Sequence, residues 1–318
     1  MKHPVKSSET ESVFWHIIRC PSCKNTLTRT RTYVRCRHCH TRYYYRQGIL
    51  RLYAQSRISK EVKKQKKHFN WYADSKKQSY DAYEMTPFWT NVDRDTFDRW
   101  LPIVPPGALV LDVGCAQGRS ALPFIRRGMH VIGYDISNAL VEIAQKRSLS
   151  YSHTKKSPYF FVGDASNFSF SDASFDVVVL HGVLHHLPNP ASVCKEIARV
   201  LKPGGIFFGL ENNTTPVRCV FDVLQRLVPQ WREEAGEVPL ISKYMFTCWF
   251  CGTGMSFVCR TRVFVPPHVI NVFPSNIAHW ILQATDMVCI RLPLVRSWGG
   301  LIEIIGKKNR EYGISNEL

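Results

Sequence analysis

The 318-residue sequence predicts an α/β fold, in which a parallel sheet follows a small N-terminal ribbon. Short apolar strands alternate with helical segments across the middle of the chain. This alternation favours right-handed crossover connections and hence a parallel sheet. Several of the strands end in an acidic residue, and two Cys-x-x-Cys pairs precede all of them. A content of 45% hydrophobic residues is ample for a packed core of this kind.

The first strand and the turn after it carry the strongest signal. The segment LVLDVGCAQGRSA, residues 109–121, joins a buried apolar strand to a glycine-interrupted turn that opens a helix near Arg119. Asp112 lies at the carboxyl end of this strand. Gly114 and Gly118 let the backbone approach a ligand closely, and the start of the helix points free amide groups at the same space. The pattern predicts a nucleotide-type pocket.

Further strands and helices continue this pattern along the chain. We expect parallel strands at 131–135, 159–165, 175–181 and 206–210, with helices at 138–146 and 191–200. Ligands in such sheets bind outside the carboxyl ends of the strands. The polar side chains expected at that edge are Asp112, Asp135, Asp164 and His181.

Five motifs occur in order within residues 105–211: LDVGCAQG, GYDIS, GDASNFSFSDASFDVV, HGVLHHLPNP and RVLKPGG. In this order they resemble the class I S-adenosylmethionine-dependent methyltransferases, in particular the branch that methylates quinones and other small molecules. The resemblance implies a Rossmann-like sheet whose last two strands, at 255–265 and 300–306, form an antiparallel edge. It also implies S-adenosylmethionine as the cofactor.

The same resemblance implies which part of the cofactor each strand end would hold. The first turn would face the methionine part, the second strand end the ribose hydroxyls, and the third the edge of the adenine. His181, at the end of the fourth strand, would lie beside the methyl group. The implied cofactor-binding residues are Asp112, Gly114, Cys115, Gly118, Asp135, Ile136, Asp164, Ala165 and His181.

One residue of the first turn departs from the family pattern. Ala116 stands where the family usually has glycine. An added methyl group is tolerated there only if φ is negative and the cofactor leaves room. The spacing from Gly114 to Gly118 also lacks the G-x-G-x-x-G pattern, which argues against a hydride-transferring dehydrogenase.

The two Cys-x-x-Cys pairs near the N-terminus predict a zinc ribbon with Cys20, Cys23, Cys36 and Cys39 as ligands. A two-stranded hairpin spans the twelve residues between the pairs. Four reduced thiols, two disulfides, or His38 or His40 as a ligand are the alternatives. Because residues 1–10 contain no apolar signal core, we expect a cytoplasmic protein rather than a disulfide-bonded secreted one. Residues 43–52 resemble the end of zinc modules that are fused to, or partner, RNA and tRNA methyltransferases.

Positive charge is concentrated in the first quarter of the chain. Residues 1–80 contain 19 Lys or Arg and 4 Asp or Glu, a net charge of +15, whereas the remainder carries +2. Lys60–Lys67 adds a basic run on an expected helix, followed by aromatic residues. Basic charge with interleaved aromatic residues can bind RNA or anionic lipid headgroups. A solvated helix face is the alternative.

We therefore expect a zinc ribbon over 1–56, a basic helical connector over 57–104, and the methyltransferase domain over 105–318, with lid insertions near 212–250 and 266–298. Within the lids, residues 216–228 and 276–298 are expected to form helices with wide apolar faces. These faces either pack as an ordinary lid, or admit an apolar substrate, or rest on a bilayer as a peripheral contact. No apolar run reaches the roughly 18 residues of a membrane span.

The expected chemistry is transfer of an electrophilic sulfonium methyl group to an acceptor that a base deprotonates. His181 and His185 are the catalytic candidates, with His186 beside them. Resembling enzymes that methylate amide and exocyclic amine nitrogens carry N-P-P-Y or D-P-P-Y after the fourth strand. This sequence has neither motif there, so the resemblance favours an oxygen or carbon acceptor, or a ring nitrogen. The leading hypothesis is a methyltransferase for a small lipophilic acceptor. An rRNA or tRNA base methyltransferase that binds RNA through the ribbon is the rival, and a non-enzymatic cofactor-binding scaffold is the third.

Overall fold

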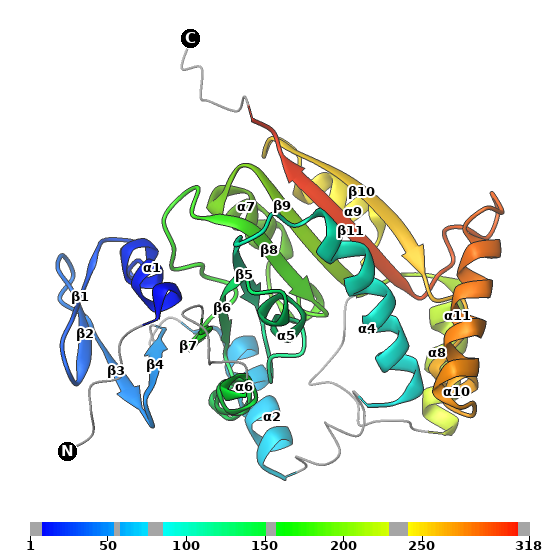
Figure 1. The fold of residues 1–318 in the computed structure, drawn as a ribbon, viewed down its shortest axis with the longest axis horizontal. Coiled ribbons are helices and arrows are strands. Elements are labelled where there is room, and N and C mark those ends of the chain that lie inside the picture. Colours follow the sequence, from blue (N-terminus) through cyan, green and yellow to red (C-terminus); the bar gives the residue numbers. More distant parts are fainter. Residues whose placement is uncertain (1–7, 54–57, 76–84, 151–156, 229–240, 311–318) are drawn as a thin grey trace.

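The computed structural model describes residues 8–53, 58–75, 85–150, 157–228 and 241–310. Its centre is one eleven-stranded sheet with the strand order β1-β2-β3-β4-β7-β6-β5-β8-β9-β11-β10 (Figure 1). Apolar residues pack on both faces of this sheet, in two clusters that together form the core. Among the helices of the described residues, none is long and apolar enough to cross a membrane.

The parallel core of the sheet agrees with the sequence prediction. Its strands are β5 (Leu109–Val113), β6 (His130–Asp135), β7 (Tyr159–Gly163), β8 (Phe175–His181) and β9 (Leu201–Asn212). All side chains of β5 are buried, as expected for a strand covered on both faces. The antiparallel edge is confirmed as well, since β9 pairs with β11 (Leu301–Lys308) and β11 with β10 (Met255–Arg262).

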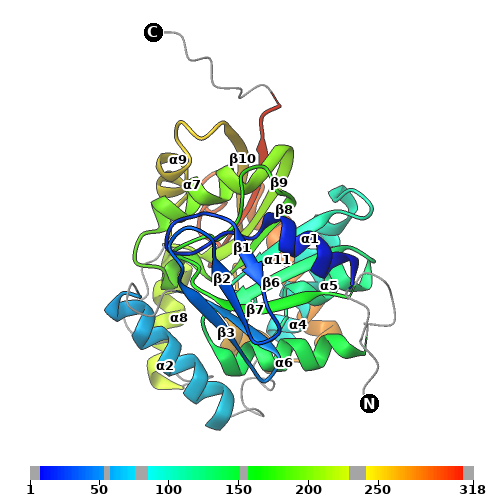
Figure 2. The same cartoon turned by 90° about the vertical axis from the view of Figure 1, so that its left-hand side faces the viewer.

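The N-terminal ribbon is an extension of this sheet. Helix α1 (Glu9–Ile17) precedes a meander of four strands: β1 (Leu27–Arg29), β2 (Tyr33–Cys36), β3 (Arg42–Arg46) and β4 (Ile49–Leu52). Strand β4 pairs in parallel with β7, so the ribbon covers the edge that β7 would otherwise expose (Figure 2). Phe14 of α1 is fully buried and stacks on Tyr159, with ring centroids 4.2 Å apart.

Helices cover both faces of the central strands (Figure 1). They are α2 (Lys60–Ser75), α4 (Pro87–Trp100), η2 (Leu101–Ile103), α5 (Ala121–Arg126), α6 (Asn138–Leu149), η3 (Leu184–His186) and α7 (Pro190–Val200). Helix α2 packs against α6, and the Ser137 hydroxyl at the start of α6 donates a 2.8 Å hydrogen bond to the Asn70 side chain of α2. The basic segment before the methyltransferase motifs is therefore part of the folded body.

Four helices lie in the C-terminal part of the chain: α8 (Pro216–Leu227), α9 (Lys243–Trp249), α10 (Pro267–Ile270) and α11 (Ser275–Cys289). Helix α11 packs against α4, and α10 contacts both α8 and α11. The expected helix over 276–298 is wrong in its second half, because the helix ends at Cys289 and residues 290–298 form turns. Pro293 has no amide hydrogen and cannot continue a helical hydrogen-bond ladder.

Candidate active site

A cavity of about 500 Å³ lies outside the carboxyl ends of the parallel strands. Side chains from the ends of β6, β7 and β8 line one part of it, and helices α2, α4 and α8, strand β9 and residues 263–267 and 300–301 line other parts. The predicted site residues that reach this cavity are Gly114, Asp135, Ile136, Asp164, Ala165, His181 and His185. Asp112, Cys115 and Gly118 are not among its lining residues.

The turn after β5 is shaped by close backbone contacts. The amide groups of Gly114 and Cys115 both donate to the carbonyl of Tyr134, at 2.9 and 3.1 Å. A Cβ atom on Gly114 would lie 2.7 Å from Val183, and its φ of +69° also favours glycine. Ala116 has a φ of +44°, so the negative angle under which its methyl group would be tolerated is not adopted. Its amide donates to Asp135 at 3.1 Å, which holds the residue in this conformation.

Two carboxyl groups flank this turn, Asp112, which is buried, and Asp135, which is half-buried. Asp112 lies behind it and accepts a hydrogen bond from the Ser120 hydroxyl, which is 2.8 and 2.9 Å from its two oxygens. Burial raises the pKa of Asp112 to about 7 and the pKa of Asp135 to about 6. Asp135 faces the cavity and also accepts from the amide of Ser137 at 2.8 Å. Asp112 therefore orders the turn, whereas Asp135 is placed to contact a ligand.

His181 belongs to an ionic cluster that the sequence did not predict. Its Nε2 lies 3.2 Å from Oδ1 of Asp93 on α4, and Asp93 also binds Arg119 with an N–O distance of 2.7 Å. Burial alone would raise the pKa of Asp93, but the charges of Arg119 and His181 outweigh it and lower that pKa to about 2. The Arg119 guanidinium also lies 4.6 Å from the ring centroid of Trp89. The cluster fixes the position of the His181 ring.

His185 is held by a second buried carboxylate. Its Nδ1 lies 2.7 Å from Oε2 of Glu211, and the other carboxylate oxygen accepts from the amides of Val183 and Leu184, both at 2.8 Å. Glu211 is 1% exposed and lies in β9. Sequence reasoning missed it, although an acid within the apolar strand LKPGGIFFGLEN was a usable signal. The His186 ring lies beside that of His185, with centroids 4.0 Å apart.

The part of the cavity away from the strand ends combines apolar and aromatic side chains with polar ones from α2 and α8. Helix α2 lines it with Val62, Phe69 and Tyr72, while Phe88 comes from α4 and Phe221 from α8. Lysines of α2 lie on its other face, because Lys63, Lys64 and Lys67 are exposed. The helix expected as a basic connector is thus a wall of the cavity with its charge turned outward.

The four cysteines of the ribbon lie together, with Cys20 and Cys36 buried. Their sulfur atoms are all within 4.8 Å of one another, with Cys20 and Cys39 3.6 Å apart and Cys23 and Cys36 3.4 Å apart. All four are free thiols. Tetrahedral zinc with bonds of about 2.3 Å requires sulfur atoms about 3.8 Å apart, so the cluster fits such an ion. The Tyr43 hydroxyl, 3.1 Å from the Cys20 sulfur, supports the cluster from β3.

Residues 111–209 match the family described as "Methyltransferase domain". A 2-methyl-6-phytyl-1,4-hydroquinone methyltransferase of Synechocystis is 37% identical over 142 residues, which are 42% of this chain and 43% of that protein. The probable tRNA methyltransferase 9B of Mus musculus is 33% identical over 137 residues, covering 41% of this chain and 28% of that one. The chain therefore spans less than half the length of these two relatives.

A solved structure agrees with the observed fold. The magnesium protoporphyrin IX methyltransferase of Synechocystis superposes with a TM-score of 0.53 at 15% identity, covering 76% of this chain and 98% of that one. At this identity the likeness concerns the fold alone. Together with the motifs and the sheet order, it identifies the central part of the chain as a class I methyltransferase domain.

Proposed function

Because the chain carries a class I methyltransferase domain, we propose that it transfers a methyl group from S-adenosylmethionine to a small lipophilic acceptor, at oxygen or carbon. The observation that carries this proposal is the single cavity in which the strand-end carboxylates and an aromatic chamber meet, with His181 and His185 between them. The hydroquinone acceptor named for the Synechocystis relative has the chemistry that such a chamber suits.

The residues at the strand ends fit the proposed cofactor. Asp135 would accept hydrogen bonds from the ribose hydroxyls beside Ile136, and Asp164 with Ala165 would hold the adenine edge. Gly114 and the backbone of Ala116 would face the methionine part. Gly118, Cys115 and Asp112 would support this turn from behind, Asp112 through its hydrogen bond from Ser120. When bound, the cofactor supplies a methyl group that is already electrophilic, so the chain's own residues orient the acceptor and exclude water.

His185 is the residue that we assign to proton removal from the acceptor. When its Nδ1–H donates to Glu211, the basic nitrogen of the ring is Nε2. A buried carboxylate thereby fixes both the tautomer and the orientation of the imidazole. His181 lines the same cavity, and its Nε2 lies 3.2 Å from Oδ1 of Asp93, so we assign it to positioning the acceptor.

We further propose that Cys20, Cys23, Cys36 and Cys39 bind one zinc ion that stabilises the ribbon. The free thiols also support the cytoplasm as the expected compartment. RNA remains the rival substrate, through the exposed lysines of α2 and the rest of the basic N-terminal region. The match to the tRNA methyltransferase of Mus musculus supports RNA as the substrate, but it covers a smaller share of that protein than the match to the hydroquinone methyltransferase does of its own.

The test is methyl transfer from radiolabelled S-adenosylmethionine with two acceptor pools, a lipid extract supplemented with a prenylated hydroquinone and total cellular RNA. We expect label in the lipid fraction, loss of that label in His185→Asn, and little effect of moderate salt. Label in RNA only, falling steeply with salt because counterion release dominates RNA binding, would replace this proposal with the rival one.

A further inference from the structure

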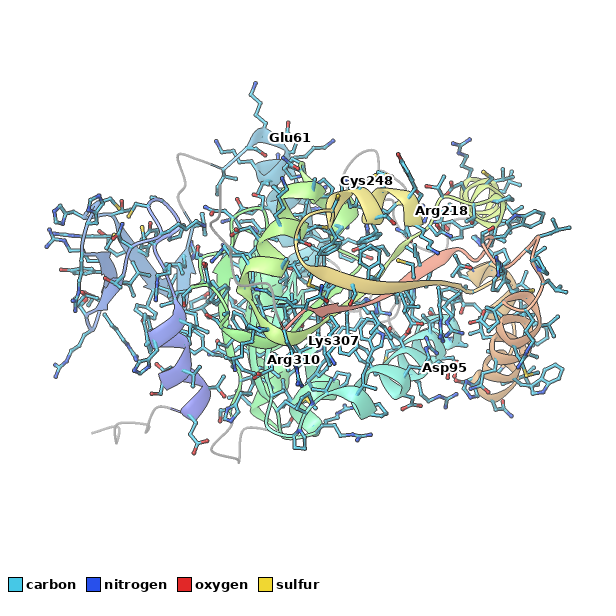
Figure 3. All side chains as sticks on the ribbon, turned by 90° about the horizontal axis from the view of Figure 1, so that it is seen from above. Glu61, Asp95, Arg218, Cys248, Lys307 and Arg310 are labelled. Atoms are coloured by element: carbon cyan, nitrogen blue, oxygen red, sulfur yellow. The ribbon has the colours of Figure 1, made fainter. Side chains whose placement is uncertain are left out.

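The inward side of helix α8 carries polar side chains beside the buried Phe221, while several of its apolar residues point outward. Arg218, Asp222 and Gln225 line the cavity, and Arg218 lies on the side of α8 that faces the body of the molecule (Figure 3). Val220 and Val223, each 54% exposed, and Leu227, 73% exposed, form the outer stripe. A helix of a globular domain normally buries its apolar stripe, so this orientation requires a reason.

Helix α11 buries Ala278 and Leu282, but it also turns polar side chains toward the body and leaves a second set of apolar residues exposed. Its inward polar residues are His279, whose Nδ1 lies 3.4 Å from Asp95 of α4, and Asp286, which accepts from the amide of Val263 at 2.8 Å. Figure 3 shows Asp95 on the side of α4 toward α11. The outer face carries Ile277, Trp280, Met287 and Val288, and Trp280 is 69% exposed.

The segments next to these helices add further exposed apolar side chains. They are Val228 after α8, Val269, Val272 and Phe273 in and after α10, and Leu292, Leu294 and Trp298 after α11. Because α10 contacts both α8 and α11, these residues and the two outer stripes belong to one end of the molecule (Figure 1), which we name the apolar end. Monomeric soluble domains rarely expose apolar surface of this extent without a binding role.

The charged residues of the apolar end indicate which kind of partner it can bind. Within residues 216–228 and 267–298, which the structure describes completely, the exposed charged side chains are Arg226, Arg291 and Arg296. The two acids in these segments point inward or are paired, since Asp222 binds Arg218 at 2.8 Å and Asp286 accepts from a backbone amide. Arginines around exposed apolar residues and tryptophans suit the interface of an anionic bilayer.

A second copy of the chain would fit the apolar end less well than an anionic bilayer. An isologous dimer would bring the same arginines of both copies to one interface, and the acids of these segments already have partners, Asp222 in Arg218 and Asp286 in the amide of Val263. We propose that the apolar end docks on an anionic lipid bilayer. This inference goes beyond the proposed function, because docking requires neither the cofactor nor methyl transfer.

The geometry also links docking to the cavity. Helix α8 presents Val220 and Val223 outward and Phe221 to the cavity, so one helix separates the docked surface from the acceptor chamber. A lipophilic molecule dissolved in the bilayer would then have a short path past α8. The ribbon lies at the opposite end of the molecule and stays away from the membrane in this arrangement (Figure 1).

The test is co-sedimentation of the full chain with vesicles of phosphatidylcholine and phosphatidylglycerol, and with vesicles of phosphatidylcholine alone. We expect binding to the anionic vesicles and at least about tenfold weaker binding to the neutral ones. Trp280→Ser with Leu294→Ser, and separately Arg291→Glu with Arg296→Glu, should each weaken binding by about tenfold or more. Val258→Ser is the matched control, because Val258 is 55% exposed but lies on β10.

Each alternative has its own result. Equal loss in Val258→Ser, or no binding to anionic vesicles, would overturn the proposal. A stable dimer that Trp280→Ser with Leu294→Ser disrupts, together with no vesicle binding, would assign the surface to a second copy. Loss of binding on charge reversal of Lys63, Lys64 and Lys67 alone would place the docking surface on α2. Thermal unfolding of each variant is measured as the control for an intact fold.

Discussion

Cofactor binding should depend on pH through Asp135. This carboxyl group lines the cavity, and burial raises its pKa to about 6 although amide groups of Ser137 and Ala116 donate to it. Ribose hydroxyls donate hydrogen bonds, so they bind the ionised carboxylate better than the neutral acid. Below about pH 6 the folded protein without ligand keeps a proton on Asp135, and ligand binding must release it. Affinity should therefore fall as the pH falls through 6.

The size of the effect follows from the pKa. A group with a pKa near 6 is about nine-tenths ionised at pH 7 and about one-tenth ionised at pH 5, so the affinity for S-adenosylhomocysteine should fall about tenfold between them. Two charge-assisted hydrogen bonds to the ribose are worth about 2–3 kcal/mol. Asp135→Asn should therefore bind roughly 30- to 160-fold more weakly at pH 7, with no change between pH 7 and pH 5.

Isothermal titration calorimetry with S-adenosylhomocysteine at both pH values measures these affinities directly. Asp172→Asn is the control, because Asp172 is an exposed acid that pairs with Arg199 outside the cavity and should bind like the wild type. An equal wild-type affinity at pH 5 and pH 7 would refute the assignment of Asp135. If Asp135→Asn keeps the tenfold fall, another group titrates, and Asp112 with its pKa of about 7 would be the first to examine.

The remaining predictions concern the metal, the turn and the proposed base. The purified wild type should contain about one zinc per chain by metal analysis, Cys36→Ser should lose it and unfold at a lower temperature, and the exposed Cys248→Ser should keep it. Ala116→Gly should stabilise the protein in urea unfolding by about 1 kcal/mol, since its φ of +44° costs a residue with a Cβ atom, and an unchanged or lower stability would contradict this reasoning. Glu211→Gln should lower kcat by about 100-fold or more while calorimetry shows unchanged S-adenosylhomocysteine binding, because a Gln amide that donates to Nδ1 of His185 leaves Nε2 protonated; an unaffected kcat would exclude the assigned base.

The order of the strands could be predicted from the sequence because buried parallel strands are short apolar runs between turn signals. Strands β5 and β8 have the expected bounds, Leu109–Val113 and Phe175–His181. Strand β9 begins at Leu201 rather than near Ile206, because the residues before the apolar run also pair with β8. Local patterns thus give the centre of each strand, whereas pairing decides its ends.

Contacts between distant segments could not be predicted in this way. Asp93 and His181 are brought together only when α4 packs over the strand ends, and no local pattern marks Asp93 as a partner of a histidine. Periodicity indicated that α8 and α11 have apolar faces but not which face points inward. The usual expectation of an inward apolar face holds only in part, since Phe221 and Leu282 are buried whereas Val223 and Trp280 point outward.

The structure also indicates which variant can distinguish a lipophilic acceptor from an RNA substrate. Removal of residues 1–67 would abolish activity with either substrate, because it deletes β4, which pairs with β7, and Val62 of the cavity wall. The outer face of α2 is the part of this region whose substitution can distinguish the two substrate classes.

Charge reversal of Lys63, Lys64 and Lys67 should leave methylation of a lipophilic acceptor within about twofold of the wild type. It should weaken RNA binding severely, since each phosphate contact contributes to the salt-dependent affinity. Lys66 is kept in this variant because its ammonium group contacts Tyr53, so its reversal would also disturb packing. A large loss of lipid methylation in the triple variant, with the fold intact by circular dichroism, would show that the basic face of α2 takes part in acceptor binding and would contradict the assignment of the acceptor to the aromatic chamber.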